Sequence, residues 1–410
     1  MQIAKDSRRA IKLAKRVLKG RRAYFDLKAM LEERGPLPEQ HYRIGVYFAD
    51  SDVNLYQMRQ WYAPLAELAR THPVVVLARN AAGARQLMRE SGLDVAYVPK
   101  VTSIESFIAT QPLEVMLYVN QNTRNFQMMR YGERWHVFIN HGESDKMYMT
   151  SNQYKAYDYA FVAGDAARAR LERALWDYDV ETRTMQIGRP QTDHLSGEPP
   201  FTPDERTVVL YAPTWEGDRP AASYGSIVTH GERLVRELLA TGRHRVVYRP
   251  HPRSGVVDSE FGDANKRIIA MIEAANQADS TAQHVYDEAP TLGWQLRLPD
   301  VAICDISAMV YDRLATGRPL MVTRPAAPEA SVDEGGYLSV CEWLGAEDAA
   351  DIAAVLDRVI DDADAQARLG EWSTRYFGDT TPGAPTERFH SAIETLLSRA
   401  DAARNAHAAL

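Results

Sequence analysis

Short apolar stretches alternate with helical patterns over the first half of the chain. Strands that are apolar throughout and are separated by helices are typical of a parallel sheet covered on both faces. The apolar stretches predict strands at residues 42–48, 73–78, 95–98, 114–119, 136–140 and 159–163. The 3.6-residue patterns predict helices at 57–71, 82–91 and 166–176.

A second set of the same kind follows residues 188–203, which contain Gly188-Arg189-Pro190 and Pro199-Pro200. Its strands are predicted at 207–212, 244–249, 284–286, 301–304 and 319–322, and its helices at 227–241, 263–278, 291–297, 307–316 and 348–361. We therefore expect two doubly wound α/β domains that face a cleft, with ligands beyond the carboxyl ends of the strands. The expected divisions are 1–40, 41–195, 196–380 and 381–410, the last of these an Ala-rich helix.

Residues 3–19 place seven Lys/Arg side chains on one arc of a helical wheel and apolar side chains on the other half. A helix of this type lies on anionic membrane surfaces. The alternative is a helix that packs on the protein body with a solvated basic face. Residues 1–30 carry ten Lys/Arg against two acidic residues, a charge of +8, so the remaining residues sum to −15 within a total of −7.

Composition excludes several classes of protein. The 410 residues are 45% hydrophobic and 25% charged, which are ordinary globular values. No apolar run reaches the roughly 18 residues of a membrane span, and no secretory signal is expected. An acidic body argues against a general nucleic-acid binder. The two cysteines, Cys304 and Cys341, indicate a reducing compartment.

Candidate chemistry follows the predicted strands. His141 comes after one strand and can accept a proton from a hydroxyl group near neutral pH. Glu143 and Lys146 follow it in the same loop, and Lys146 could balance phosphate charge. Thr214 and Trp215 follow the first strand of the second set. Thr214 could contact phosphate, whereas Trp215 could stack on a ligand or only pack beneath a loop.

Two further strand ends carry polar residues. Arg249 and His251 end one strand, and the prolines on either side of His251 fix its backbone for a ligand contact or for a purely structural turn. Asp305, Ser307 and Asp312 follow another. Ser307 is a helix N-cap that could bind an anion or serve only its own helix, and Asp312 can accept hydrogen bonds from hydroxyl groups. The chain has no glycine-rich dinucleotide fingerprint, no P-loop and no metal triad, so we expect no cofactor and no dedicated metal site.

These residues form motifs in a recognisable order: His141-Gly142-x-x-x-Lys146, Tyr211-Ala212-Pro213-Thr214-Trp215, Arg249-x-His251-Pro252, Asp305-x-Ser307 with Asp312, Arg318-Pro319, and Asp379-x-x-x-Gly383-Ala384-x-x-Glu387-Arg388. Together they resemble the CDP-glycerol glycerophosphotransferases, the teichoic-acid primases and polymerases. The resemblance spans residues 141–388, and the N-terminal domain is matched only by architecture and position.

The resemblance implies a GT-B fold of two Rossmann-like domains, a donor bound mainly by the C-terminal domain, and a cytoplasmic protein on the inner face of the membrane. It also implies transfer of an alditol phosphate from a CDP-alditol, CDP-glycerol above all, to a hydroxyl group of a lipid-linked or polymer acceptor, with release of CMP. His141 would be the general base, and His251 would stabilise the pyrophosphate. The residues implied for the donor are Thr214, Arg249, His251, Asp305, Ser307 and Asp312; those on the acceptor side are Glu143 and Lys146.

The sequence departs from the family pattern at three places. Ala308 replaces a hydroxyl residue, Glu143-Ser144 replaces Thr-Pro, and the loop after Trp215 is acidic where the family has a basic residue. Three alternatives therefore stay open. One is a GT-B glycosyltransferase with a nucleotide-sugar donor, another is a non-catalytic scaffold, and the third is unrelated chemistry on the same fold, such as epimerisation of a sugar nucleotide.

Overall fold

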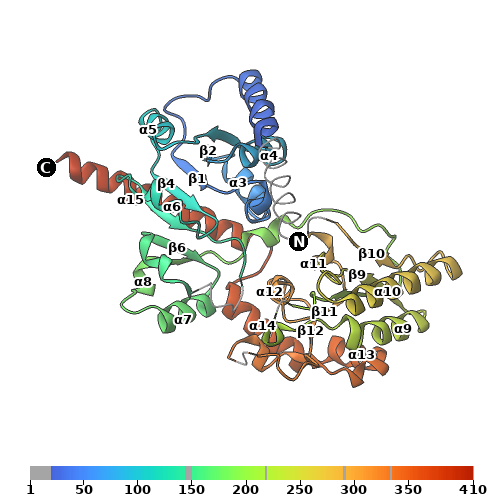
Figure 1. Ribbon diagram of the computed structural model, residues 1–410. Helices are drawn as coiled ribbons and strands as arrows, with labels where there is room; N and C mark the ends of the chain where they lie inside the picture. Colours follow the sequence, from blue (N-terminus) through green and yellow to red (C-terminus); the bar gives the residue numbers. More distant parts are fainter. Residues whose placement is uncertain (1–19, 144–149, 218, 290–291, 333–334, 410) are drawn as a thin grey trace, which may run out of the picture.

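The computed structural model describes residues 20–143, 150–217, 219–289, 292–332 and 335–409. It shows two α/β domains joined by a segment around residues 187–206. The last helix, α15, returns to the first domain (Figure 1). The predicted basic helix at residues 3–19 lies outside the described residues, as does Lys146. Membrane contact through residues 3–19 therefore stays a prediction.

The first sheet is parallel throughout and has the strand order β3-β2-β1-β4-β5-β6-β7. Its central strands are buried on both faces, which explains why they are continuous apolar runs. The strands are β1 (Ile44–Phe48), β2 (Val74–Ala78), β3 (Asp94–Tyr97), β4 (Val115–Tyr118), β5 (Trp135–Phe138), β6 (Tyr159–Val162) and β7 (Thr184–Gln186). In register, Ile44 lies between Val74 and Val115.

The second sheet is also parallel, with the order β10-β9-β8-β11-β12-β13. The strands are β8 (Thr207–Ala212), β9 (His244–Tyr248), β10 (Val285–Tyr286), β11 (Val301–Cys304), β12 (Leu320–Thr323) and β13 (Glu342–Leu344). Cys304 and Cys341 are free and buried. In both sheets the strand order reverses beside the first strand, which is the place where ligands bind in sheets of this kind.

Helices cover both faces of each sheet (Figure 1). Around the first they are residues 20–34, α2 (Leu55–Arg59), α3 (Tyr62–Leu68), α4 (Ala81–Glu90), α5 (Val101–Ala109), α6 (Asn125–Met129), α7 (Asp165–Ala174) and α8 (Val180–Arg183). Around the second they are α9 (Glu232–Ala240), α10 (Ser259–Ala278), α11 (Trp294–Arg297), α12 (Ala308–Leu314), α13 (Ile352–Asp361) and α14 (Ala363–Phe377). The short helical turns are η1 (Asp52–Asn54), η3 (Asn152–Ala156), η4 (Pro190–His194), η5 (Pro220–Ala222), η6 (Ile227–Gly231), η7 (Tyr337–Ser339) and η8 (Glu347–Ala350).

The last helix, α15 (Ala384–Ala408), packs on the first sheet although it follows the second in sequence. Its buried Phe389, Ile393 and Leu396 belong to the core of the first sheet. Asp193 fixes the start of α15, because its carboxylate accepts hydrogen bonds from the backbone N–H groups of Gly383 and Thr386. The C-terminal segment therefore ties the two sheets together.

The predicted strands are present, with most of their ends shifted by one or two residues, but several other predictions were wrong. The helix predicted at 57–71 is interrupted between α2 and α3, where Trp61 turns inward and its ring Nε1–H donates to the Asn140 carbonyl at 2.5 Å. The helix predicted at 227–241 opens with the π-helical turn η6. The elements α5, α6, α8, α14, β7 and β13 were not predicted.

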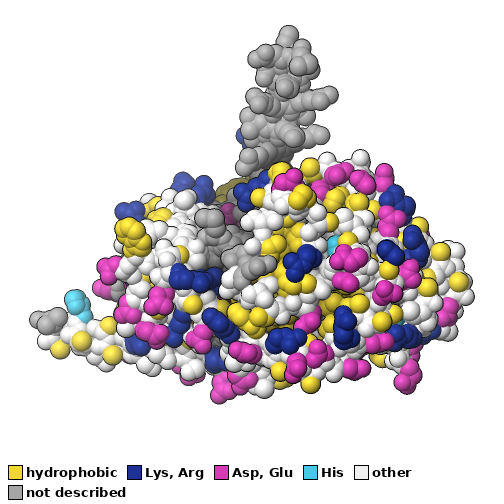
Figure 2. Space-filling view, turned by 90° about the horizontal axis from the view of Figure 1, so that it is seen from below, with side chains coloured by type: hydrophobic (Ala, Val, Ile, Leu, Met, Phe, Trp, Pro, Cys, Tyr) yellow, Lys and Arg dark blue, Asp and Glu magenta, His cyan; other side chains and the backbone are white. Residues whose placement is uncertain are grey.

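Seen from below, acidic and basic side chains are intermixed over the surface, and the end of α15 projects from the body (Figure 2). Among the residues that the structure describes, no helix combines the length and the apolar character that crossing a bilayer requires.

Candidate active site

A cavity of about 580 Å³ lies at the carboxyl end of the second sheet, and we call it the second-sheet cavity. Thr214, Arg249, His251 and Ser307 all line it, from the segments after β8, β9 and β11. Small-molecule sites of α/β domains lie at this edge and typically enclose about 300–1,000 Å³. The structure therefore brings four of the predicted residues to one concave site.

His251 is held in one tautomer. Its backbone N–H donates to the Pro213 carbonyl at 3.1 Å, and its Nδ1 atom accepts from the backbone N–H of Arg253 at 3.1 Å. A backbone N–H only donates, so the proton of the neutral ring is on Nε2. The rings of His251 and Trp215 have their centroids 6.4 Å apart, and both residues line the cavity. The neutral ring of His251 therefore has an N–H group at Nε2.

Asp305 does not line the cavity, so its predicted contact with a donor molecule is corrected. The side chain is fully buried, and its carboxylate accepts from Thr214 N–H at 2.7 Å, Ser226 N–H at 3.0 Å and the Thr323 hydroxyl at 2.6 Å. Burial raises the pKa of Asp305 to about 6, against the lowering effect of these hydrogen bonds. Asp305 is a positioning residue that holds the Thr214 loop from beneath.

Two other charged residues of this region also have structural partners. The guanidinium of Arg249 pairs with Asp287 and donates to the Ala289 carbonyl at 2.8 Å, which ties together two walls of the cavity. Glu216, in the acidic loop, is buried, and it accepts from the N–H groups of Gly255, Val257 and Asp258. The acidic departure therefore stabilises the turn before α10.

Ser307 caps α12 at the edge of the same cavity. Its hydroxyl oxygen accepts from Met309 N–H at 3.3 Å, and Ala308 is the first residue of the helix. Arg313 fixes α12 from behind, because its buried guanidinium donates to the Leu296 and Pro299 carbonyls at 2.6 and 2.8 Å. The N-terminal end of α12 is thus presented to the cavity by a rigid support.

His141 lies at the carboxyl end of the first sheet. Its Nδ1–H donates to the Val119 carbonyl at 2.9 Å, because a carbonyl oxygen only accepts. This bond leaves Nε2 as the ring nitrogen that can take a proton. Burial lowers the pKa of His141 below its ordinary value of 6.5, and the charge of Arg189 lowers it further. The imidazole is therefore an uncharged base at neutral pH.

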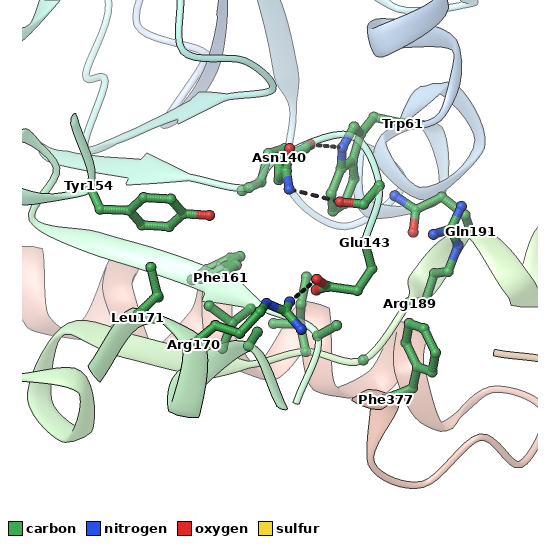
Figure 3. A pocket seen from close by; sticks show the side chains of 17 residues that line it. Trp61, Asn140, Glu143, Tyr154, Phe161, Arg170, Leu171, Arg189, Gln191 and Phe377 are labelled. Atoms are coloured by element: carbon green, nitrogen blue, oxygen red, sulfur yellow. Dashed lines mark hydrogen bonds and ion pairs between the residues drawn. The ribbon is translucent and has the colours of Figure 1, made fainter. Parts of the chain in front are cut away.

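Glu143 points toward Arg170 of α7 in a cavity of about 40 Å³ (Figure 3). The two side chains form an ion pair and are 8% and 10% exposed. A cavity of this size holds at most a few water molecules. Glu143 is therefore held in a salt bridge with Arg170, and the acceptor-side role predicted for it stays a prediction.

Arg189 links the two sheets and was overlooked as a functional residue in the sequence. It lies beside Gln191 in Figure 3, and its guanidinium pairs with the Asp312 carboxylate at 2.5 Å. Both side chains are 11% exposed. Asp312 thus faces the junction between the sheets and does not line the second-sheet cavity. The basic residue next to Gly188 in the linker was the only sequence signal for this contact.

The described residues contain no cluster of three or more His, Cys, Asp or Glu side chains suited to a metal ion. Neither the second-sheet cavity nor the small cavity beside Glu143 is lined by His141. Arg189 lies between the two sites. Its charge lowers the pKa of His141, and its guanidinium pairs with Asp312 on α12.

Solved structures share this two-sheet architecture. The wall teichoic acid polymerase TagF, in a variant soaked with CDPG, superposes with a TM-score of 0.53 and 13% identity over 97% of this chain and 98% of the other. A glycosyltransferase from Rickettsia africae gives a TM-score of 0.51 and 10% identity over 87% and 99% of the two chains. A UDP-N-acetylglucosamine 2-epimerase gives 0.52 and 12% over 85% and 94%. The fold is therefore GT-B, as predicted.

The sequence places the chain more closely within that class. Residues 102–393 match the family model of the CDP-glycerol:poly(glycerophosphate) glycerophosphotransferases. This match covers well over half of the 410 residues, so the chain belongs to that family and is a glycerophosphotransferase-like transferase. No curated protein matches it.

Proposed function

We propose that this protein transfers an alditol phosphate from a CDP-alditol, CDP-glycerol above all, to a hydroxyl group of a lipid-linked or polymer acceptor, and that it releases CMP. The observation that carries the proposal is the convergence of Thr214, His251 and Ser307 on the second-sheet cavity in a chain of this family. TagF, which has the same fold, is a wall teichoic acid polymerase and was soaked with CDPG. A role in synthesis of a teichoic-acid-like or capsular polymer follows as part of the proposal.

The reaction needs a base on the acceptor side and charge stabilisation on the donor side. The acceptor oxygen attacks the phosphorus that carries the alditol, and its proton moves to Nε2 of His141. The bond from that phosphorus to the bridging oxygen breaks, and CMP leaves with the bridging electron pair. Such transfers depend on positioning and electrostatics more than on covalent help from the protein.

The donor-side roles follow from the positions of the side chains. His251 donates its Nε2–H to a pyrophosphate oxygen and so stabilises the charge of the departing CMP. Thr214 and Ser307 offer their hydroxyl groups to phosphate oxygens at the cavity wall. Arg249 shapes that wall through Asp287. Asp312 lies outside the second-sheet cavity, and at the junction it would hold a donor hydroxyl group only where the donor extends beyond that cavity toward Arg189.

The location of the protein belongs to the same proposal. A lipid-linked acceptor is confined to the membrane surface, so the enzyme must work there. The seven Lys/Arg residues of positions 3–19 would hold it to the anionic inner face as a peripheral, cytoplasmic protein. No nucleic acid is part of the proposed reaction.

The test is release of CMP by the purified full-length chain from CDP-glycerol and from CDP-ribitol, with anionic liposomes and a lipid-linked acceptor. We expect CMP in equal amount to the alditol phosphate that appears on the acceptor. UDP-N-acetylglucosamine serves as the control donor. Transfer of a sugar from this control donor, with CDP-glycerol and CDP-ribitol untouched, would overturn the proposal in favour of a glycosyltransferase.

A further inference from the structure

Polar side chains gather at the carboxyl ends of three neighbouring strands of the first sheet. Asp50 follows β1 and Asn120 follows β4, and His141 lies beyond β5. The strands β1, β4 and β5 are adjacent, so these three residues lie along one sheet edge.

A chain of hydrogen bonds connects this edge to the segment η1–α2. The side-chain amide of Asn120 donates to the Asp50 carboxylate at 2.8 Å and to the side-chain amide oxygen of Gln57 at 2.7 Å. Gln57 in turn donates to the Tyr56 hydroxyl at 3.3 Å, and Asn54 donates to Asp50 at 3.1 Å. Asn120 is buried, whereas Asp50 and Gln57 are partly exposed. The network is therefore buried at Asn120 and reaches solvent at Asp50 and Gln57.

Tyr56 connects this network to His141. Its ring meets the His141 ring edge to face, with centroids 5.8 Å apart, although Tyr56 is 53% exposed. Leu55 and Met58 on the same short helix are fully buried and anchor it to the core. A large aromatic side chain beside a catalytic base, held by its helix yet half in solvent, is placed to contact a ligand.

We propose that Tyr56, Gln57 and Asp50 bind the terminal unit of the acceptor beside His141, and that this unit is a polyol or a sugar with neighbouring hydroxyl groups. The proposal rests on the proposed function, in which His141 is the base. The Asp50 carboxylate accepts hydrogen bonds from hydroxyl groups and repels phosphate. Gln57 both donates and accepts, and the Tyr56 ring covers the C–H face of the ligand.

The decisive experiment compares Tyr56→Ala with Val53→Ala in the full chain. Val53 lies in the adjacent turn η1, is 76% exposed and serves as the matched control. The probe is a synthetic octyl glycoside that ends in a glycerol phosphate unit with free hydroxyl groups, and the donor is CDP-glycerol. We expect Tyr56→Ala to raise the KM for the probe by about tenfold, the effect of losing a contact of about 1.4 kcal/mol. The Kd for CDP-glycerol should change by less than twofold.

Tyr56→Phe separates the ring from its hydroxyl group. This variant should keep most of the affinity for the probe and leave the pH dependence of kcat unchanged, since the ring still covers His141. An unchanged KM in Tyr56→Ala, or an equal rise in Val53→Ala, would overturn the inference.

Binding of the same probe by saturation-transfer NMR needs no turnover. If wild type transfers no glycerol phosphate to the probe, the proposed function fails, yet an NMR signal of the probe in wild type that is lost in Tyr56→Ala would still support the acceptor surface. An NMR signal that is equal in wild type and Tyr56→Ala would overturn the inference by itself.

Discussion

The carboxyl edges of the two sheets are built in different ways. The second sheet encloses a cavity of about 580 Å³, and its wall loops are held by buried groups such as Asp305 and Arg313. The first sheet presents His141, Tyr56 and a hydrogen-bonded polar rim, and none of these residues lines that cavity. This difference fits the proposed ligands. A small donor would be enclosed by the second sheet, whereas a long acceptor would bind along the exposed edge of the first sheet.

The largest expected effect is on the enclosed side. In His251→Ala the departing CMP loses the Nε2–H donor, so kcat should fall by about 100- to 1,000-fold. The Kd for CDP-glycerol should rise much less, because the donor acts most strongly on the charge that develops in the transition state. Rapid-quench measurement of CMP release, with calorimetry for donor binding, checks both values. A loss confined to donor binding would show that His251 only holds the ground state.

The next effect concerns the contact that joins the two edges. Arg189→Met leaves the Asp312 carboxylate buried without its partner and should lower the free energy of unfolding by about 3 kcal/mol. The charge of Arg189 also lowers the pKa of His141, so its removal should raise that pKa. Activity that depends on the uncharged base would then begin to fall at a higher pH.

Chemical denaturation and the pH profile of kcat/KM measure these two consequences separately. Arg236→Met on α9, away from the junction, is the matched control for loss of a positive charge. An acid limb that stays at the wild-type pH would contradict the electrostatic link between Arg189 and His141.

A smaller effect is expected from Asp305→Asn. An amide can offer N–H groups where the N–H groups of Thr214 and Ser226 point, so the wall loop should shift and the Kd for CDP-glycerol should rise about tenfold. Wild type should show the same trend on acidification. Since the pKa of Asp305 is raised to about 6, the carboxylate gains a proton as the pH falls through that value, and donor affinity should decline.

Titration of CDP-glycerol binding between pH 5 and pH 8 tests this expectation. In Asp305→Asn the decline near pH 6 should disappear, because the titrating group is gone. A decline that persists unchanged in the variant would assign it to another group.

The smallest effect should come from Glu216→Gln. Loss of the carboxylate weakens three hydrogen bonds to the turn before α10, at a cost of about 1–2 kcal/mol in unfolding free energy. The KM for the donor should rise only a few-fold, because the turn adjoins the cavity without donating to the ligand. Thermal unfolding and donor titration measure these quantities. A loss of activity as large as that of His251→Ala would mean that Glu216 contacts the donor directly.

Much of the fold could be predicted from the sequence because buried parallel strands are continuous apolar runs. The strands at 207–212 and 301–304 have the predicted bounds. The short edge strands β7 and β13 have only three residues each and no comparable apolar run. The break between α2 and α3 depends on the contact of Trp61 with Asn140, which lies far along the chain and leaves no local signal.

The sequence predicted where the candidate residues lie in the fold, but it did not predict the partners of their carboxylates. Strand ends identified His141, His251, Thr214 and Ser307, because chemistry in parallel sheets concentrates there. Asp305 and Glu143 have the same local pattern as ligand-binding residues, yet their partners are backbone N–H groups and Arg170. Such partners come from distant segments, so only the tertiary structure separates a positioning carboxylate from a binding one.

The central claim is that His141 is the base that activates the acceptor. The measurement is single-turnover release of CMP from CDP-glycerol with lipid-linked acceptor, for wild type and His141→Ala, at matched occupancy of the donor. The account predicts a fall of about 100- to 10,000-fold in His141→Ala with the Kd for CDP-glycerol unchanged. Release at the wild-type rate, with transfer to the acceptor intact, would contradict it.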